Sequence, residues 1–524
     1  MTSLTWLLAL SPILVVLVLM VGFRWGGNRA GPAGWFTALL VALLFFGATP
    51  ELIAYSQLKA ALLTFYVLYI IWMALVLFNV VNEAGAIEVI GAGIVHLTGD
   101  RVMQLLFLGW IFNAFLQGVA GFGVPVAVVA PLLVGLGFQP VVAVSAAAIG
   151  HAWSVTFGSI ASSFQALIAA TGLLGEALAP WSAILLALAC LGCGWCAAHA
   201  YDGWRALRRG FLPVLLIGLA MGGTQYVLAT RGMWNIAAFM AGLVGLGVGT
   251  LVVRLPIYRG DEVGAVRELS LQGSKDPRTS MGLPLALSAY LLLVAIVVSA
   301  ELIPSLKGFL GQVVLRVDFP AIITHYGWTT PAEVGRTIDL FGHAGALLAY
   351  TALIAYGLYW ATGHYRPGAL RRIAAHTLRS AVPSSLGIAA MVGMATFMSH
   401  SGMIHLLAEG LSRSVGRAFP LASPFIGLLG TFMTGSNTNS NVIFATLQQQ
   451  TAELLRVSAL VILGAQTAGG ALGSMLAPAK VIVGCSTAGL AGREGEVLKR
   501  TLTYGLVITG AIGLVTWLVV YVLR

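Results

Sequence analysis

Charged residues are scarce in this chain. Only 9% of its 524 residues are Asp, Glu, Lys or Arg, against roughly a quarter in soluble proteins. Hydrophobic residues make up 59%, and the mean hydropathy is +0.93. A soluble protein of this length could not cover its surface with so little charge. The composition therefore predicts an all-α polytopic membrane protein, whose helices satisfy their own backbone hydrogen bonds inside the bilayer.

The chain also lacks a long basic run with interleaved aromatic residues, although its net charge is +10. Its Lys and Arg residues lie between apolar segments, where a cytoplasmic surplus orients a membrane protein. The positive charge therefore indicates topology, and we expect no nucleic-acid partner.

Cysteine is scarce as well, with four residues in the whole chain. Cys190, Cys193 and Cys196 recur every three positions, so they occupy about a third of the circumference of one apolar helix. We interpret them as small packing residues. No metal site and no organic cofactor are expected.

Apolar stretches long enough to cross a bilayer recur along the chain. They fall at 4–23, 33–50, 60–81, 180–200, 211–229, 234–253, 283–303, 340–360, 380–399 and 501–522. The first is too long for the core of a signal peptide and is predicted to be a retained span. Two regions, 102–172 and 418–490, are interrupted by Gly, Pro and polar residues.

These two interrupted regions share a pattern of glycines. Gly121 and Gly150 are separated by the same interval as Gly435 and Gly464, and several shorter matches follow in the same order. Equal spacings in one order predict an internal repeat.

Each repeat is predicted to contain a re-entrant hairpin and a broken helix. The expected organisation is N-terminal spans in 1–59, repeat 1 in 60–200 (hairpin 102–136, broken helix 139–172), inter-repeat spans and connectors in 201–379, and repeat 2 in 380–522 (hairpin 418–453, broken helix 457–489). If the paired arms are hairpins, about 12 transmembrane helices remain and the repeats are inverted. One face then gains a consistent Lys/Arg surplus, which predicts that both termini are periplasmic.

The most polar stretch in apolar sequence is 435–441, at the tip of the second hairpin. Polar backbone survives at membrane depth only where it lines a protein cavity, and half-helix N-termini favour anions. Between 102 and 172 there is no Asp or Glu, and between 418 and 490 only Glu453. The sequence therefore predicts a mid-membrane site for an anion. The alternative is a polar loop outside the membrane.

Two further residues could take part in transport. Lys480 is an ammonium inside apolar sequence and would need an anionic partner, unless it reaches to a nearby interface. His151 is the titratable group in the core of repeat 1 and could carry a proton, or it could be a neutral packing residue. A hydrolase using His151 and Ser154 would also need an orienting carboxylate, which that region lacks, so we expect no enzyme.

Several motifs resemble those of the L-lactate permease family. They are Gly121-Phe122-Gly123-Val124-Pro125, the run from Gly150 to Ser159, the run from Gly435 to Asn441, Gly469-Gly470, and Ala477-Pro478-Ala479-Lys480. The resemblance implies a symporter of the bacterial inner membrane that carries L-lactate, and often D-lactate and glycolate, with protons. The tip at Ser436 also resembles those of sodium-coupled divalent-anion transporters, which keeps a sodium-coupled carboxylate symporter as the alternative.

The sequence thus predicts a proton-coupled transporter of small 2-hydroxymonocarboxylates that works by alternating access. Its proton carrier is expected to be His151, and it is left open whether the chain forms a homodimer. The predicted substrate-binding residues are Gly121, Phe122, Gly123, Ser154, Ser159, Ser436, Asn437, Thr438, Asn439, Ser440, Asn441, Ser474 and Lys480.

Overall fold

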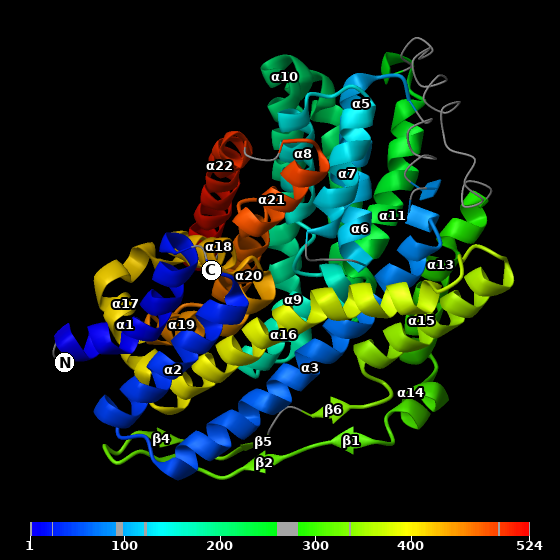
Figure 1. Ribbon diagram of the computed structural model, residues 1–524. Coiled ribbons are helices and arrows are strands. Elements are labelled where there is room, and N and C mark those ends of the chain that lie inside the picture. Colours follow the sequence, from blue (N-terminus) through cyan, green and yellow to red (C-terminus); the bar gives the residue numbers. More distant parts are fainter. Residues whose placement is uncertain are drawn as a thin grey trace.

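Helices dominate the computed structural model of the protein (Figure 1). It describes residues 3–23, 25–87, 89–90, 98–119, 123–258, 281–334, 337–490 and 493–522. In these parts, 8 helices are long and apolar enough to cross a membrane, and four shorter apolar helices accompany them. The fold class, an all-α polytopic membrane protein, is therefore confirmed.

Three helices precede the first interrupted region. They are α1 (Ser3–Leu17, prolonged by a π-turn at Val18–Gly22), α2 (Gly27–Phe45) and α3 (Pro50–Glu83). The start of α3 is fixed by Thr49, whose hydroxyl accepts the backbone N–H of Leu52 at 3.1 Å, and by proline at the first helical position.

The first interrupted region forms a helical hairpin followed by a helix in two pieces. The elements are α5 (Arg101–Leu106), η2 (Phe107–Phe112), α6 (Asn113–Val119), α7 (Val124–Gly135), α8 (Pro140–Ala152) and α9 (Gly158–Thr171). The tip residues Gly121 and Phe122 lie outside the described residues.

The middle of the chain supplies further spans. They are α10 (Gly175–Thr230), α11 (Trp234–Val253), α13 (Leu283–Leu302) and α15 (Ala344–Ala361), with the short helices η3 (Pro256–Tyr258) and α14 (Pro304–Leu310) beside them. Most of the predicted connector 254–280 lies outside the described residues.

Helix α10 is two antiparallel arms. Its backbone leaves helical geometry at Asp202 and Gly203. A Cβ on Gly222 would meet Ala187, and a Cβ on Gly218 would meet Leu191, so later residues pack against earlier ones in reverse order. The two spans predicted at 180–200 and 211–229 are therefore both present, joined by a sharp reversal.

A two-stranded ribbon occupies the second connector. Its strands pair antiparallel as β1 (Val314–Leu315) with β6 (Ile338–Asp339), β2 (Asp318–Phe319) with β5 (Glu333–Val334), and β3 (Ile322–Ile323) with β4 (Thr329–Thr330). The ribbon runs beneath α3 in Figure 1. Thr330 donates a hydrogen bond to the backbone oxygen of His400, so the ribbon covers the ends of α3 and α16.

The second interrupted region repeats the order of the first. The elements are α16 (Ala369–His400), α17 (Met403–Val415), η5 (Gly416–Ala418), α18 (Phe419–Thr434), α19 (Asn437–Leu454), α20 (Ala459–Gly473), α21 (Pro478–Thr487) and α22 (Glu494–Tyr521).

The predicted polar tip of the second hairpin, 435–441, is irregular only in part. Helix α19 begins at Asn437, so only Gly435 and Ser436 lie between the two arms. The hydroxyl of Ser436 accepts the backbone N–H of Asn439, and this cap starts the helix early. The broken helix predicted at 457–489 is interrupted between Gly473, where α20 ends, and Pro478, where α21 begins.

The first helices of the two repeats, α3 and α16, lie side by side and run in opposite directions (Figure 1). Near the start of α3, Gln57 donates to the backbone oxygen of Gly393. Near its end, Asn79 donates to Thr377. The residue numbers of the bonded partners fall along α16 as they rise along α3, so the two helix axes are antiparallel. Inverted repeats require this arrangement.

Contacts between the repeats are also reciprocal. The second arm of hairpin 1, α7, packs on α21, the second half of the broken helix in repeat 2. The second arm of hairpin 2, α19, packs on α9, the second half of the broken helix in repeat 1. This exchange places both hairpin tips and both helix breaks in one central region.

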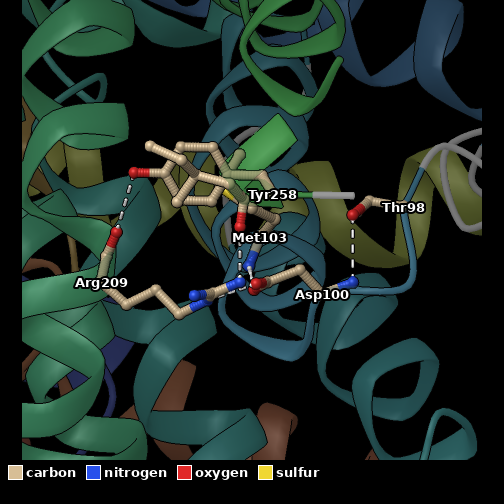
Figure 2. A network of polar contacts seen from close by, with 6 residues as sticks. Thr98, Asp100, Met103, Arg209 and Tyr258 are labelled. Carbon is tan, nitrogen blue, oxygen red and sulfur yellow. Dashed lines mark hydrogen bonds and ion pairs between the residues drawn. The ribbon is translucent and has the colours of Figure 1, made fainter. Parts of the chain in front are cut away.

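A hydrogen-bonded ion pair anchors the start of the first hairpin (Figure 2). Asp100 caps α5 by accepting the backbone N–H of Met103 at 3.0 Å. Its other carboxylate oxygen binds Arg209 of α10 at 2.5 Å. The backbone oxygen of Arg209 accepts the hydroxyl of Tyr258. Three segments distant in sequence are joined at this end of the molecule.

We predict that Asp100→Ala lowers the midpoint of thermal unfolding of the purified protein more than Asp100→Asn does. Alanine loses both the cap and the ion pair, whereas asparagine can still cap the helix. Loss of the cap costs about 1 kcal/mol, and Arg209 is exposed enough to regain water. Glu496→Gln, which removes an exposed ion pair with Arg493, should leave the midpoint unchanged. Equal midpoints for all three variants would contradict the anchoring role.

Candidate functional site

The chain reverses at the tip of the second hairpin through one glycine. Gly435 ends α18 with φ 72°, a left-handed conformation that favours glycine. Ser436 follows in extended geometry and caps α19. The residues from Asn437 to Asn441 therefore form the first turn of a helix, with their side chains pointing in different directions.

Two asparagines of this turn bind the other repeat. Asn437 donates to the hydroxyl of Thr156, in the first helix break, at 3.1 Å. Asn441 donates to the backbone oxygen of Ser163 on α9 and to the hydroxyl of Thr467 on α20, both at 2.9 Å. Thr156 in turn donates to the backbone oxygen of Thr467 at 3.0 Å. All five residues are buried, so these bonds lock the second tip to the first break.

Two more predicted residues of this turn, Thr438 and Ser440, also face protein. The hydroxyl of Thr438 lies 3.2 Å from that of Ser163. Ser440 donates to the backbone oxygen of Gly427 within its own hairpin at 2.8 Å. In this conformation Asn437, Thr438, Ser440 and Asn441 hold elements together and do not line the cavity described next.

A cavity of about 370 Å³ lies beside the tip, which we call the Lys480 cavity. It is bounded by α2, α16, the second hairpin and α21, and is lined by Gly27, Asn28, Ser380, Pro383, Gly387, Ile388, Thr434, Gly435, Ser436, Asn439, Lys480 and Val483. Asn28 and Ser380 are exposed, so the cavity opens toward the start of α2 and the middle of α16.

Lys480 supplies the positive charge of this cavity. It is buried and donates to the hydroxyl of Ser474 at 3.0 Å. It also lies in the first turn of α21, which starts at Pro478. A cation there is at the positive end of the helix dipole, where an anion would be stabilised. The position is therefore costly for lysine unless a negative group occupies the cavity.

Both hairpins approach this lysine. Ser436 and Asn439 of the second tip line the same cavity, and a Cβ on Gly123 of the first tip would lie 3.6 Å from Cγ of Lys480. Gly123 has φ 88°, which only glycine adopts readily. Four predicted site residues, Gly123, Ser436, Asn439 and Ser474, therefore lie around Lys480.

The lining also offers a hydrogen-bond acceptor. The side-chain oxygen of Asn439 is buried and has no partner among the described residues. Leaving such an oxygen unpaired costs free energy, so a donor is expected there. A solute carrying a carboxylate and a hydroxyl group could satisfy both Lys480 and Asn439.

The first helix break is strained. Ser159, Ile160 and Ala161 all have left-handed φ angles, 47°, 55° and 58°. Each such residue costs about 1–2 kcal/mol, and strain of this kind concentrates at functional sites. Ser159 is buried and does not line the Lys480 cavity.

His151 is fully buried at the end of α8. Its Nδ1 lies 3.1 Å from the backbone oxygen of Ala147, so Nδ1 is the protonated nitrogen. Its Nε2 has no partner among the described residues. Ser154 donates to the backbone oxygen of His151, not to its ring, so the pair lacks the geometry of a hydrolase.

Sequence reasoning missed several residues of the site. Ser163 and Thr467 hold the second tip, but they are isolated hydroxyls in apolar helices and carry no local signal. Asn28 and Ser380 line the cavity from helices that were predicted only as spans. Thr156 lies within the motif from Gly150 to Ser159 that the sequence pointed out. Its role in holding the second tip was not predicted.

Metal binding has no candidate among the described residues, where no group of three or more His, Cys, Asp or Glu side chains is placed to hold an ion.

We predict that Gly470→Ala abolishes transport, or lowers it at least tenfold, in membranes that contain normal amounts of the protein. An added Cβ would collide with the side-chain oxygen of Asn437 and press on Thr431, which breaks the link to Thr156. Gly247→Ala is the matched control, because a Cβ there meets nothing within 4 Å. Equal transport by the two variants would show that the link is dispensable.

Comparisons with known proteins point to one family. The model of the L-lactate permease family matches residues 5–523. The L-lactate permease of Salmonella typhimurium is 29% identical over 99% of this chain and 96% of its own length. The glycolate permease GlcA of Escherichia coli is 28% identical, covering 98% and 96%. The L-lactate permease of Bacillus subtilis is 26% identical, covering 98% and 95%.

A solved structure is also similar. The YdaH transporter of Alcanivorax borkumensis aligns with 15% identity and a TM-score of 0.45, over 87% of this chain and 85% of that one.

Proposed function

The chain belongs to the L-lactate permease family, and from this premise we propose that it is a proton-coupled symporter of L-lactate and related small 2-hydroxymonocarboxylates, such as D-lactate and glycolate. Relatives named as lactate and glycolate permeases support this substrate class. The observation that carries the proposal is the Lys480 cavity, where a buried ammonium, two helix N-termini and an unpaired amide oxygen converge.

Each part of a hydroxy acid has a complementary group in this cavity. The carboxylate pairs with Lys480 and with the N-terminus of α19 at Ser436. The hydroxyl donates to Asn439, whose side-chain oxygen is buried without a partner. Ile388 and Val483 present apolar surface to the short alkyl group. The predicted wall at Phe122 lies outside the described residues.

Movement of the solute follows an alternating-access cycle. The hairpins and broken helices form the transport unit, and α3 and α16 form the scaffold beside it. The fold carries no carboxylate in the Lys480 cavity among the described residues, which favours an anionic solute. As in its relatives, we place the chain in a bacterial membrane as a multi-pass transporter and not an enzyme, with both termini on the periplasmic side. Whether it forms a homodimer stays a prediction to be tested.

Proton coupling fits the charge of the solute. Lactate is ionised at pH 7, so symport with one proton is electrically neutral and a pH gradient alone can drive it. His151 is the proposed carrier, because an imidazole can take up and release a proton and its Nε2 has no partner among the described residues.

We predict that proteoliposomes containing the protein accumulate labelled L-lactate when the outside is made acidic, with or without sodium. A protonophore should abolish the accumulation. Uptake that ignores the pH gradient but follows sodium would contradict proton coupling and support the sodium-coupled alternative. His151→Gln should keep exchange of labelled for unlabelled lactate while losing the response to pH. A His151→Gln variant that still accumulates lactate would exclude this residue as the carrier.

We predict that Lys480→Gln raises the KM for lactate about 10- to 100-fold, because a hydrogen bond to a charged group contributes about 1.5–3 kcal/mol. Lys499→Gln is the control, since Lys499 is an exposed lysine of α22 and should leave KM unchanged. The measurement is the concentration dependence of lactate exchange in proteoliposomes. A wild-type KM in Lys480→Gln would remove the basis of the proposed site.

A further inference from the structure

A second, smaller cavity lies farther along the same helices, and we call it the Lys59 chamber. Its volume is about 50 Å³. It is enclosed by α3, α9, α16 and α19, and its polar lining consists of Lys59, Thr396, Ser399, His400 and Thr446. No carboxylate is among the described residues that line it.

The chamber and the Lys480 cavity lie in series along α16 and α19. On α16, the Lys480 cavity ends at Ile388 and the chamber begins at Val392, one helical turn later. On α19, the boundary falls between Asn439 and Val442. The two spaces are therefore neighbours on opposite sides of a thin partition.

The partition is apolar. Ile388, Val392 and Val442 belong to one buried cluster that also contains Val67 and Ala166. Valine, isoleucine and alanine side chains hold no water and no ion, so the partition seals the two spaces from each other. Small movements of α19 relative to α16 would open it.

Together the two spaces reach across the bilayer. From Ser380, which lines the Lys480 cavity, to His400, which lines the chamber, α16 rises about 30 Å at 1.5 Å per residue. The hydrocarbon core of a bilayer is about 30 Å thick. A solute that follows α16 through both spaces would therefore traverse the membrane.

The chamber resembles the Lys480 cavity in chemistry. An ammonium and several hydroxyl groups line part of the chamber, and apolar side chains line the rest. Lys59 is half-buried, whereas His400 is buried. Both also interact with other groups of the protein, so Lys59 would exchange a resident partner for an arriving carboxylate.

From this arrangement we propose that the Lys59 chamber is a second binding site for the carboxylate of the transported hydroxy acid, on the opposite side of the partition from Lys480. The proposal rests on the proposed function. In the present conformation the chamber has room for water but not for a hydroxy acid. It is the collapsed counterpart of the open Lys480 cavity, and it widens when the protein faces the other side of the membrane.

The position of the β-ribbon indicates which side of the membrane the Lys59 chamber faces. Thr330 of β4 donates a hydrogen bond to the backbone oxygen of His400, so the ribbon lies beside the mouth of the chamber. Arg371 and Arg372 lie near the start of α16, at the other end of this helix from His400, and Arg209 lies close to the reversal of α10 at Asp202 and Gly203. If the arginine-rich face is cytoplasmic, the chamber is the periplasmic site and the Lys480 cavity opens inward.

The first experiment measures the concentration dependence of lactate exchange for Lys59→Gln, Lys59→Arg and the control Lys307→Gln. Lys307 is an exposed lysine of α14. We expect Lys59→Gln to raise KM about 10-fold with little change at saturating lactate, because one charged hydrogen bond is lost. Lys59→Arg should stay within about twofold of wild type, and Lys307→Gln should match it.

A KM for Lys59→Gln within twofold of wild type would overturn the proposal, as would an equal rise for Lys307→Gln. The outcome is separable from the proposed function. A wild-type protein that exchanges no lactate contradicts the function itself. A wild-type protein that exchanges lactate, with an unchanged KM in Lys59→Gln, contradicts only the second site.

The main readout of a second experiment does not depend on the folding of a lysine variant. Ser399→Cys places a thiol in the chamber while keeping Lys59, and the unsubstituted chain gives the background from the native cysteines. An anionic thiosulfonate reagent should modify this thiol several times faster than a cationic one, and lactate should slow the reaction. The preference should vanish when Lys59→Gln is added. A thiol that reacts with neither reagent, or one that prefers the cationic reagent, would overturn the proposal.

Discussion

The structure depends on a small set of buried hydrogen bonds between its two halves. Asn437 and Asn441, at the start of α19, reach Thr156 and Ser163 of the first repeat through their amide nitrogens. Thr467 completes the set on α20. In an apolar interior an unpaired amide costs far more than in water. The second tip is therefore held in one place, and the Lys480 cavity beside it has a defined shape.

That constraint explains how a lysine can be buried in the membrane interior. Lys480 lies at the N-terminal end of α21, where the helix dipole disfavours a cation, and among the described residues it donates to the neutral hydroxyl of Ser474. A site that is costly when empty is stabilised by an anion. This electrostatic imbalance is the basis of the preference for a carboxylate that we propose for the cavity.

Much of this architecture follows from local sequence. The glycine at 435 ends one helix and the serine at 436 starts the next, so the hairpin could be predicted. The equal glycine spacings revealed the repeat, since close helix contacts recur at matching places. A Cβ on Gly158 would meet the backbone oxygen of Gln117, and one on Gly473, at the matching place in the second repeat, would meet that of Leu428. The first interrupted region has no carboxylate and the second has only Glu453, which predicted an anionic solute.

The assignment of individual side chains could not be predicted in the same way. Asparagines at 437, 439 and 441 look alike in sequence, yet only Asn439 lines the cavity and the other two bind the first repeat. Helical geometry separates them, because neighbouring residues of one turn point in different directions. The chamber at Lys59 was also invisible in sequence, since its walls come from four helices that are distant along the chain.

The central claim is that a carboxylate binds between the second hairpin tip and α21. The most direct measurement is an experimental structure of the protein in lipid with L-lactate bound. This account predicts density for the carboxylate within hydrogen-bonding distance of Nζ of Lys480 and next to Ser436, with the hydroxyl toward Asn439. Lactate bound elsewhere while Lys480 keeps only protein partners, or a tip at 435–441 exposed to bulk water, would contradict it.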